Sequence, residues 1–407
     1  MKIHFIGIGG IGTSALAQYY ISKGHEVSGS DLVMSEITQM AAKKGVKIFE
    51  GNSAGNISED IDLVVHSPAV PATNPEYKAA KDLGIKTQSY PEALGDLTRE
   101  YYTIAVSGSH GKSTTTAMVG LMMERAGLDP TVIIGTKVKE FGDSNFREGK
   151  SKYLVIEACE YDSSFLHYAP AIIVITNVDK EHLDYFKTFE NVKKAFKDFT
   201  EKLPADGHLI ENTPINSKLK NLLQVPGQHN ESNASQAFEV GKILGIDEKI
   251  ILESLAKFNG TWRRFEVKQG FADNKEIIVV SDYGHHPNEV AATLKAAREK
   301  YGAKKIWCVF QPHQYQRTYY LFDDFVKTFK DAAIDKTIIT DIYDVAGREI
   351  KEISQDVSPQ KIVDKVAKDS VIYLSVENIA EYLKENMQTG DVLLVMGAGD
   401  IYKLADE

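Results

Sequence analysis

The chain has 407 residues, of which 43% are hydrophobic and 26% are charged, a composition typical of a soluble globular protein with about three domains. Its net charge of −10 disfavours a nucleic-acid binder, which would normally carry a basic face. Two cysteines are too few for a disulfide framework, no apolar run approaches the roughly 18 residues of a membrane span, and the N-terminus lacks a leader pattern. We therefore expect a cytoplasmic protein without nucleic-acid or membrane partners.

The first segment, residues 1–98, has a β-α-β pattern. An apolar strand is followed by the glycines at 7, 9, 10 and 12, a helix over 13–23, and a second strand that ends at Ser30 and Asp31. This G-x-G-x-x-G spacing with a following acidic residue predicts a nucleotide diphosphate at the helix N-terminus. It does not specify NAD, and a tight turn with glycines needed only for packing is the alternative. A further strand over 61–65 runs toward Ser67, at a ligand-facing edge.

The second segment, residues 99–261, begins with a strand, a turn and a helix that read AVSGSHGKSTTT. Lys112 follows a glycine-bearing turn, and the Ser113 hydroxyl is placed to hold Mg²⁺. The residues predicted to surround the phosphates of ATP are Gly108, Ser109, His110, Gly111, Lys112, Ser113 and Thr114. Val106 stands where the usual phosphate loop has its first glycine, which argues against an ordinary GTPase or motor ATPase.

Acidic and histidine side chains follow two further strands of this segment, over 153–156 and 171–176. Because the carboxyl ends of parallel strands meet at one edge of a sheet, Glu157 and His182 are predicted near the phosphate loop. Glu157 suits Mg²⁺, which prefers oxygen ligands, whereas His182 is a less usual ligand and could be a surface histidine. Glu160 could equally be a helix cap or a solvated charge.

The third segment, residues 262–407, alternates strands over 276–280, 305–310, 337–340 and 391–395 with helices, which predicts another α/β unit. Before it, His229 and Asn233 lie in a helix start that could contact adenine or be only an Asx-rich cap. Within it, His313 and Arg317 could receive a carboxylate or a phosphate, or belong to a surface loop.

Taken together, these strings resemble the Mur ligases of peptidoglycan synthesis, and in particular the alanine-adding type. The resemblance covers nearly the whole chain and rests on HFIGIGGIG, SGSHGKSTTT, EACEYDSSF, TNVDKEHLDYF, PGQHNESNA, GTWRRFEV, SDYGHHPNEV, FQPHQYQRT and GDVLLVMGAG. It implies an α/β protein of three domains: a Rossmann-like UDP-binding domain (1–98), a central P-loop ATPase domain with a parallel sheet (99–261), and a C-terminal Rossmann-like domain (262–407).

The resemblance also implies ATP-dependent joining of L-alanine to the lactyl carboxylate of UDP-N-acetylmuramate, through an acyl phosphate and with Mg²⁺. Lys112 would stabilise the γ-phosphoryl group, and Ser113, Glu157 and His182 would hold metal. His229 and Asn233 would flank adenine, with Arg264 on the phosphates and Asp282 on the ribose, while His313 and Arg317 would lie near the reacting carboxylates. The uridine diphosphate would contact Gly7, Gly9, Gly10, Gly12, Ser30, Asp31 and Ser67.

Two departures and three alternatives accompany this interpretation. The stretch over 199–226 is shorter than is typical of the alanine-adding type, and Gln314 stands where some relatives carry a cation. The alternatives are a recycling ligase that adds a preformed tripeptide, an NAD-dependent oxidoreductase, and a nucleotide-binding protein without catalysis. The motif from Gln311 to Thr318 disfavours the recycling ligase, and the second nucleotide loop disfavours the oxidoreductase. A protein without catalysis is disfavoured by the intact Lys112, Glu157 and His182. We expect a monomer or a weak homodimer.

Overall fold

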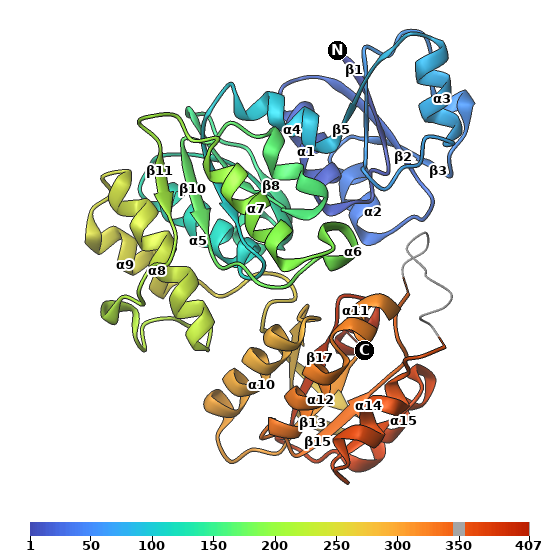
Figure 1. The fold of residues 1–407 in the computed structure, drawn as a ribbon, viewed down its shortest axis with the longest axis vertical. Helices are drawn as coiled ribbons and strands as arrows, with labels where there is room; N and C mark the ends of the chain where they lie inside the picture. Colours follow the sequence, from blue (N-terminus) through green and yellow to red (C-terminus); the bar gives the residue numbers. More distant parts are fainter. Residues whose placement is uncertain (345–354, 407) are drawn as a thin grey trace. The chain divides into compact units, whose positions relative to one another are not determined.

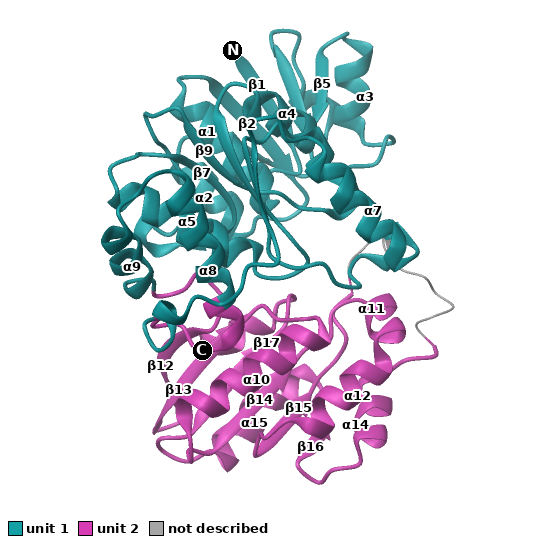
Figure 2. Ribbon diagram, turned by 60° about the vertical axis from the view of Figure 1, so that its left-hand side comes forward, with its two compact units in different colours: residues 1–222, 232–258 teal, residues 223–231, 259–407 magenta. Residues whose placement is uncertain are grey.

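The structure, a computed structural model, describes residues 1–344 and 355–406. The chain separates into two compact units, residues 1–222 with 232–258 and residues 223–231 with 259–407 (Figure 2). The described residues form a five-stranded sheet and two six-stranded sheets, one after another along the chain, which confirms the predicted α/β class. Among the described residues, no helix has the length and apolar character needed to cross a membrane.

The first sheet is parallel throughout, in the order β3-β2-β1-β4-β5 (Figure 1). Its helices begin at clear sequence signals: Asn74 caps α3 ahead of Pro75, and Ser89 and Glu92 form a capping box at α4. The elements are β1 (Lys2–Ile6), α1 (Ile11–Ser22), β2 (Glu26–Asp31), α2 (Glu36–Lys43), β3 (Lys47–Glu50), β4 (Leu63–His66), α3 (Pro75–Asp82), β5 (Lys86–Ser89) and α4 (Tyr90–Thr98).

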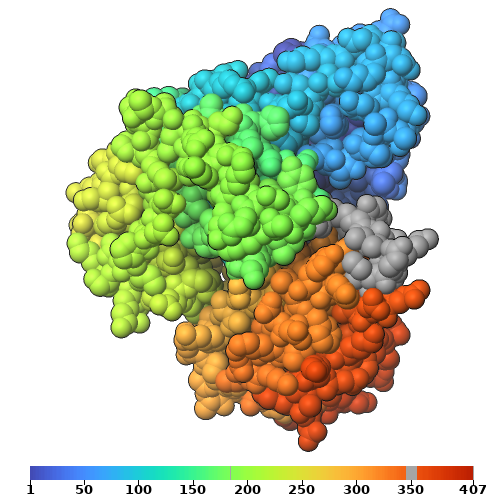
Figure 3. Space-filling view, viewed as in Figure 1, coloured from blue at the N-terminus to red at the C-terminus, as the bar shows by residue number. Residues whose placement is uncertain are grey.

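The second sheet has the order β11-β10-β6-β9-β7-β8, and β7 and β8 form an antiparallel hairpin at one edge. The sequence predicted the parallel strands but not this hairpin. Helix α7 packs through Val192, Phe196 and Phe199, and its charged residues face the surface (bright green in Figure 3). The elements are β6 (Tyr102–Ser107), α5 (Lys112–Arg125), β7 (Thr131–Val138), β8 (Ser144–Arg147), β9 (Tyr153–Glu157), β10 (Ile172–Ile175), α6 (Leu183–Phe186), α7 (Phe189–Thr200), β11 (His208–Ile210), α8 (Gln228–Ile243) and α9 (Glu248–Ala256).

The third sheet has the order β12-β13-β17-β14-β15-β16 and is parallel except for β12, which pairs antiparallel with β13. Two apolar clusters cover its faces, one around Phe310 and Phe325 and the other around Trp307 and Leu383. The elements are β12 (Glu266–Ala272), β13 (Lys275–Asp282), α10 (Pro287–Tyr301), β14 (Ile306–Phe310), α11 (Tyr315–Tyr320), α12 (Phe322–Asp331), β15 (Lys336–Ile339), α14 (Pro359–Val366), β16 (Val371–Tyr373), α15 (Val376–Asn386) and β17 (Val392–Met396). Each predicted segment holds one sheet, and its end points stay predictions.

A buried polar network joins the first two sheets within one unit. The Asn145 side chain on β8 donates hydrogen bonds to the Ser14 hydroxyl (2.8 Å) and to the Ile11 carbonyl in the first turn of α1. Its own oxygen accepts a hydrogen bond from Gln18 (2.7 Å), whose oxygen accepts one from Ser144 (3.1 Å). The hairpin is therefore fastened to the helix that follows the first glycine-rich loop.

Asn145→Ala is expected to destabilise the protein by about 2–3 kcal/mol, because it leaves buried partners on α1 without hydrogen bonds. Urea denaturation of the full chain measures the change. Asn386→Ala, which removes a hydrogen bond at the exposed end of α15, is the matched control and should stay within about 0.5 kcal/mol of the wild type. Equal unfolding midpoints for the two variants would show that the network does not stabilise the unit.

Candidate functional site

The loop between β6 and α5 is the centre of the candidate site. Gly108 has a φ of 134°, and a Cβ atom there would lie 1.9 Å from Oγ1 of Thr176. Gly111 has a φ of 82°, and a Cβ atom there would lie 2.4 Å from Oδ1 of Asn233. Both positions need glycine, because other side chains rarely adopt such φ values and would clash. The loop leads directly into the N-terminus of α5, where backbone N–H groups bind anions.

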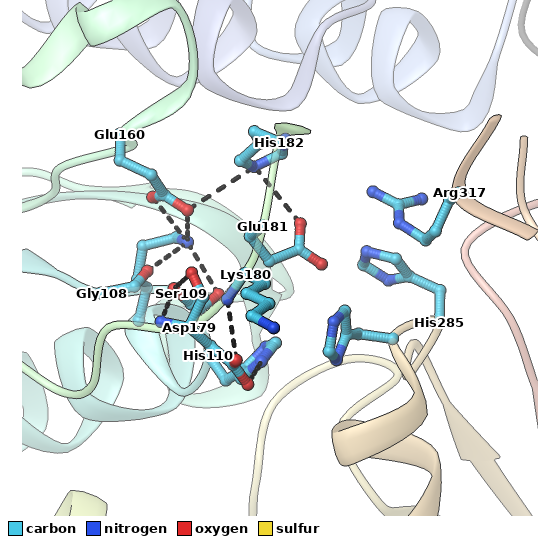
Figure 4. Close-up of polar contacts among 12 residues, drawn as sticks. Gly108, Ser109, His110, Glu160, Asp179, Lys180, Glu181, His182, His285 and Arg317 are labelled. Atoms are coloured by element: carbon cyan, nitrogen blue, oxygen red, sulfur yellow. Dashed lines mark hydrogen bonds and ion pairs between the residues drawn. The ribbon is translucent and has the colours of Figure 1, made fainter. Parts of the chain in front are cut away.

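The segment after β10 holds this loop in place. Oδ1 of Asn177 accepts a hydrogen bond from the His110 N–H (2.9 Å), and its Nδ2 donates one to the His110 carbonyl (3.0 Å). The Ser109 hydroxyl accepts a hydrogen bond from the N–H of Asp179 (2.8 Å), and the His110 imidazole lies 3.4 Å from the Asp179 carboxylate (Figure 4). The polar residues predicted at the end of this strand therefore shape the loop itself.

Lys112 lies inside this loop. Its Nζ is 2.6 Å from the Gly108 carbonyl oxygen and 3.2 Å from that of Ser109. It also lies 2.9 Å from Oε2 and 3.2 Å from Oε1 of Glu160. Burial by itself would lower the pKa of Lys112, but the nearby carboxylates, chiefly Glu160 and then Glu157, raise it well above its usual value. Lys112 is therefore a fixed positive charge.

Glu160 is the residue whose role the sequence did not reveal. Its side chain is only 1% exposed, and it makes no side-chain cap at the short helix that it precedes. Both sequence interpretations, the helix cap and the solvated charge, are therefore wrong. Its Oε1 lies 3.6 Å from Nε2 of His182, so the carboxylate stands between the lysine and the histidine (Figure 4). No sequence pattern marks a buried glutamate three residues after a strand end.

The predicted metal ligands lie on three elements around the loop. Glu157 ends β9, and its Oε2 accepts a hydrogen bond from the N–H of Gly135 on β7 (2.8 Å). Ser113 and Thr114 are buried in the first turn of α5. His182 has a left-handed backbone (φ 55°), and its imidazole lies edge-on to Tyr161. The carboxylates of Glu160 and Glu181 flank this imidazole at 3.6 and 3.7 Å.

His229 and Asn233 lie one turn apart on α8. Desolvation by the surrounding protein lowers the pKa of His229 to about 4, so this imidazole is neutral at pH 7. A Cβ atom on Gly227 would lie 2.6 Å from its ring, which shows how closely the preceding turn packs against it. A neutral ring that a ligand can reach from solvent is suited to contact an apolar or aromatic ligand face rather than a phosphate.

The glycine-rich loop after β1 is built on the first sheet. The N–H of Gly7 donates a hydrogen bond to the Ser30 carbonyl (2.9 Å), and that of Gly9 donates one to the Asp31 carboxylate (2.7 Å). A Cβ atom on Gly12 would lie 2.8 Å from the Tyr90 hydroxyl. The strand-end residues predicted for a diphosphate are thus gathered at one edge of this sheet: Gly7, Gly9, Gly10, Gly12, Asp31 and Ser67.

Ser30 differs from the other residues predicted for this loop. It is fully buried, and its hydroxyl donates a hydrogen bond to the Glu76 carboxylate, which also accepts one from Asn56 (2.5 Å). His4, also fully buried, lies 3.7 Å from the same carboxylate. Although burial works against it, the nearby His4 and the hydrogen bonds from Ser30 and Asn56 hold the pKa of Glu76 below its usual value. The Ser30 side chain therefore supports the loop from behind.

Asp282, at the end of β13, is buried and fastens two backbone segments. Its Oδ2 accepts a hydrogen bond from the N–H of Phe265 (2.8 Å), and its Oδ1 accepts one from that of Gly284 (2.8 Å). Burial raises the pKa of this carboxyl. The contact predicted between Asp282 and a ribose stays a prediction. In this structure the Asp282 carboxylate holds two backbone segments together.

The two arginines before β12 have different surroundings. Arg264 lies 3.6 Å from the Glu289 carboxylate and over the ring of Tyr283. Arg263, which the sequence did not single out, is buried and donates hydrogen bonds to the carbonyls of Gly397 and Gly399. Arg264 is thus the arginine with the more open side chain, at 27% exposure, as its predicted phosphate contact requires.

His313 and Arg317 are brought together at the start of α11. A guanidinium nitrogen of Arg317 lies 3.1 Å from Nδ1 of His313, and the His313 ring stacks on Tyr343 with an interplanar angle of 8°. Gln314 between them has a φ of 70°, and its N–H donates a hydrogen bond to the Tyr343 carbonyl (2.8 Å). Gln314 therefore has a strained backbone conformation between a histidine and an arginine. Backbone strain of this kind is concentrated at binding and active sites.

Family models match most of the chain in three consecutive parts. The "Mur ligase family, catalytic domain" model matches residues 2–102, the "Mur ligase middle domain" model residues 106–237, and the "Mur ligase, glutamate ligase domain" model residues 263–399. The order and extent of these matches follow the three sheets.

Several similar proteins are named UDP-N-acetylmuramate–alanine ligase. The chain is 41% identical to the UDP-N-acetylmuramate–L-alanine ligase of Acetivibrio thermocellus, over 99% of this chain and 94% of that protein. It is 39% identical to the corresponding ligase of Clostridium tetani, over 100% and 97%. The solved UDP-N-acetylmuramate–alanine ligase of Thermotoga maritima superposes with a TM-score of 0.82 at 28% identity, covering 100% of this chain and 97% of that one. A murein peptide ligase from Psychrobacter arcticus shares the fold, with a TM-score of 0.72 at 22% identity over 100% and 97% of the two chains. The chain belongs to the Mur ligase family.

Proposed function

We propose that this protein is an ATP-dependent ligase that joins L-alanine to the lactyl carboxylate of UDP-N-acetylmuramate. The observation that carries the proposal is the phosphate loop with its partly buried and ion-paired Lys112, in a unit that also holds a separate glycine-rich loop. One loop suits ATP and the other a second nucleotide, which a dehydrogenase would not need. The names of relatives about 40% identical over the full chain supply the substrates.

The reaction must activate a carboxylate, which is a poor electrophile. A carboxylate oxygen attacks the γ-phosphorus of ATP, the bond to the β–γ bridging oxygen breaks, and ADP leaves an acyl phosphate behind. The alanine amino group then attacks the acyl carbon and loses a proton, and phosphate departs with the electron pair of the broken C–O bond. Lys112 and the N–H groups of its loop would stabilise the charge on the transferring phosphoryl group.

The residues around the loop fit Mg²⁺. Two carboxylates, Glu157 and Glu160, act on a single ammonium group, so this region has negative charge to offer a cation. Ser113 and Glu157 supply the oxygen ligands that Mg²⁺ prefers, and His182 would add an imidazole. Bound Mg²⁺ would neutralise charge on the phosphate oxygens. The hydrogen bond from the Gly135 N–H fixes the orientation of the Glu157 carboxylate.

For the remaining predicted residues we propose the roles that the family resemblance implies. ATP phosphates would meet the loop over 108–114 and Arg264, adenine would meet His229 and Asn233, and the ribose would meet Asp282. The UDP-sugar would occupy the loop after β1, with Ser30 acting from behind it. We also propose that the enzyme works in the cytoplasm, where its ATP is made, as a monomer or weak homodimer, which analytical ultracentrifugation tests.

Phosphate release tests the proposed activity. It should require ATP, Mg²⁺, UDP-N-acetylmuramate and L-alanine together, and omission of any one should reduce it to background. A preference for a preformed tripeptide over L-alanine would replace the proposal with a recycling ligase. Nucleotide binding without phosphate release in the complete mixture would indicate a binding protein instead.

Arg317→Lys is expected to raise the KM for L-alanine at least about tenfold and to leave the KM for ATP within about twofold. The planar guanidinium can bind the amino acid carboxylate through two parallel hydrogen bonds, which a lysine cannot reproduce. Initial rates at varied alanine and varied ATP give both constants. Arg99→Lys, at an exposed arginine paired with Asp96, is the control and should change neither. If the ATP constant rises instead, Arg317 serves the nucleotide.

A further inference from the structure

The ammonium group of Lys112 is fully engaged within the loop. A lysine ammonium carries three N–H donors and no acceptor. Here the acceptors are the Gly108 carbonyl at 2.6 Å, the Ser109 carbonyl at 3.2 Å and the Glu160 carboxylate at 2.9 Å. Three acceptors account for three donors, so a phosphate that binds to Lys112 has to displace one of them.

Glu160 is the acceptor that a phosphate can replace. The two carbonyls belong to the loop backbone, which Thr176 and Asn177 hold in place, whereas Glu160 is a side chain that carries the same sign of charge as a phosphate. Its carboxylate is buried and would be costly to leave without a cation. His182, at 3.6 Å, lies beside it and is in a position to keep one partner next to that carboxylate.

We infer that Glu160 is a positioning residue that holds Lys112 in the loop until the γ-phosphate of ATP takes its place. In the nucleotide-free protein the Lys112–Glu160 pair keeps the lysine extended along the loop. When ATP binds, Lys112 exchanges the carboxylate for the γ-phosphate, and Glu160 remains beside His182. The inference rests on the proposed function, because it takes ATP as the nucleotide of this loop.

The exchange makes a prediction that distinguishes ATP from ADP. Glu160→Gln keeps the shape of the side chain but removes the competing charge, so ATP should bind about fivefold to tenfold more tightly. ADP lacks the γ-phosphate, and its Kd should change less than about twofold. Calorimetry on the full chain with ATP and with ADP, both without Mg²⁺, measures the two changes. Glu160→Asp, which keeps the charge on a shorter side chain, should restore the wild-type ratio of ATP to ADP affinity at least in part.

Two further variants separate this exchange from a general effect of charge. Glu181→Gln removes a negative charge from an equally buried carboxylate that also flanks His182, and it should not change the ratio of ATP to ADP affinity. In a Lys112→Ala background, Glu160→Gln should no longer favour ATP over ADP, because the lysine through which it acts is gone. An effect of Glu160→Gln that persists without Lys112, or that Glu181→Gln reproduces, overturns the inference.

The outcomes also separate the inference from the proposed function. If the wild type forms product but Glu160→Gln binds ATP no more tightly, only the inference fails. If the wild type binds neither ATP nor ADP, the proposed function fails as well. If Glu160→Gln does not fold, Glu160→Asp takes its place in the test. A change in the ATP-to-ADP affinity ratio caused by Glu160→Asp that is as large in the Lys112→Ala background as in the otherwise wild-type protein overturns the inference.

Discussion

Lys112→Ala is expected to lower the rate of phosphate release by on the order of 10³-fold while leaving the Kd for UDP-N-acetylmuramate within about twofold of the wild type. Lys112 acts on a phosphoryl group at the loop between β6 and α5, whereas the glycine-rich loop predicted for the UDP-sugar follows β1 in a different sheet. Phosphate release measures the first effect, and calorimetry with the UDP-sugar measures the second.

The variant needs a control for folding, because it leaves the buried carboxylate of Glu160 without its lysine. A thermal denaturation scan shows whether the variant is folded at the assay temperature. Lys194→Ala, on the exposed face of α7, should match the wild type in both assays. If the affinity for the UDP-sugar collapses in folded Lys112→Ala, the two nucleotide sites are not separate.

Glu157→Gln should reduce the turnover number by on the order of 10²-fold or more. The glutamine keeps an oxygen that can accept the hydrogen bond from Gly135, so the local backbone is preserved and the lost property is the negative charge. That charge is what a Mg²⁺ ligand contributes. Turnover measured over a range of Mg²⁺ concentrations checks the assignment, with the exposed Glu140→Gln as the control. Near-normal turnover at saturating Mg²⁺ would remove Glu157 from the ligand set.

The sequence by itself determined the fold class, the family and the position of both glycine-rich loops. These features depend on residues that are close together in the chain: an apolar strand, a turn that needs glycine at Gly108 or Gly111, and a helix start. Local backbone chemistry of this kind is readable from a short string, because few other residues can occupy such positions. For the same reason, His313 and Arg317, four residues apart after a predicted strand, could be paired from the sequence, and the structure brings them together where α11 begins.

The tertiary structure decided which charged and polar side chains are buried, and against what. The sequence suggested a helix cap or a solvated charge for Glu160, yet the convergence of β6, β9 and the segment after β10 places it between Lys112 and His182. Asn145 gives no sequence signal either, because its partners on α1 lie more than 100 residues away. The free energy of a buried charge or amide depends on partners supplied by distant segments, so only the assembled sheets show whether such a group is a site, a clamp or a surface residue.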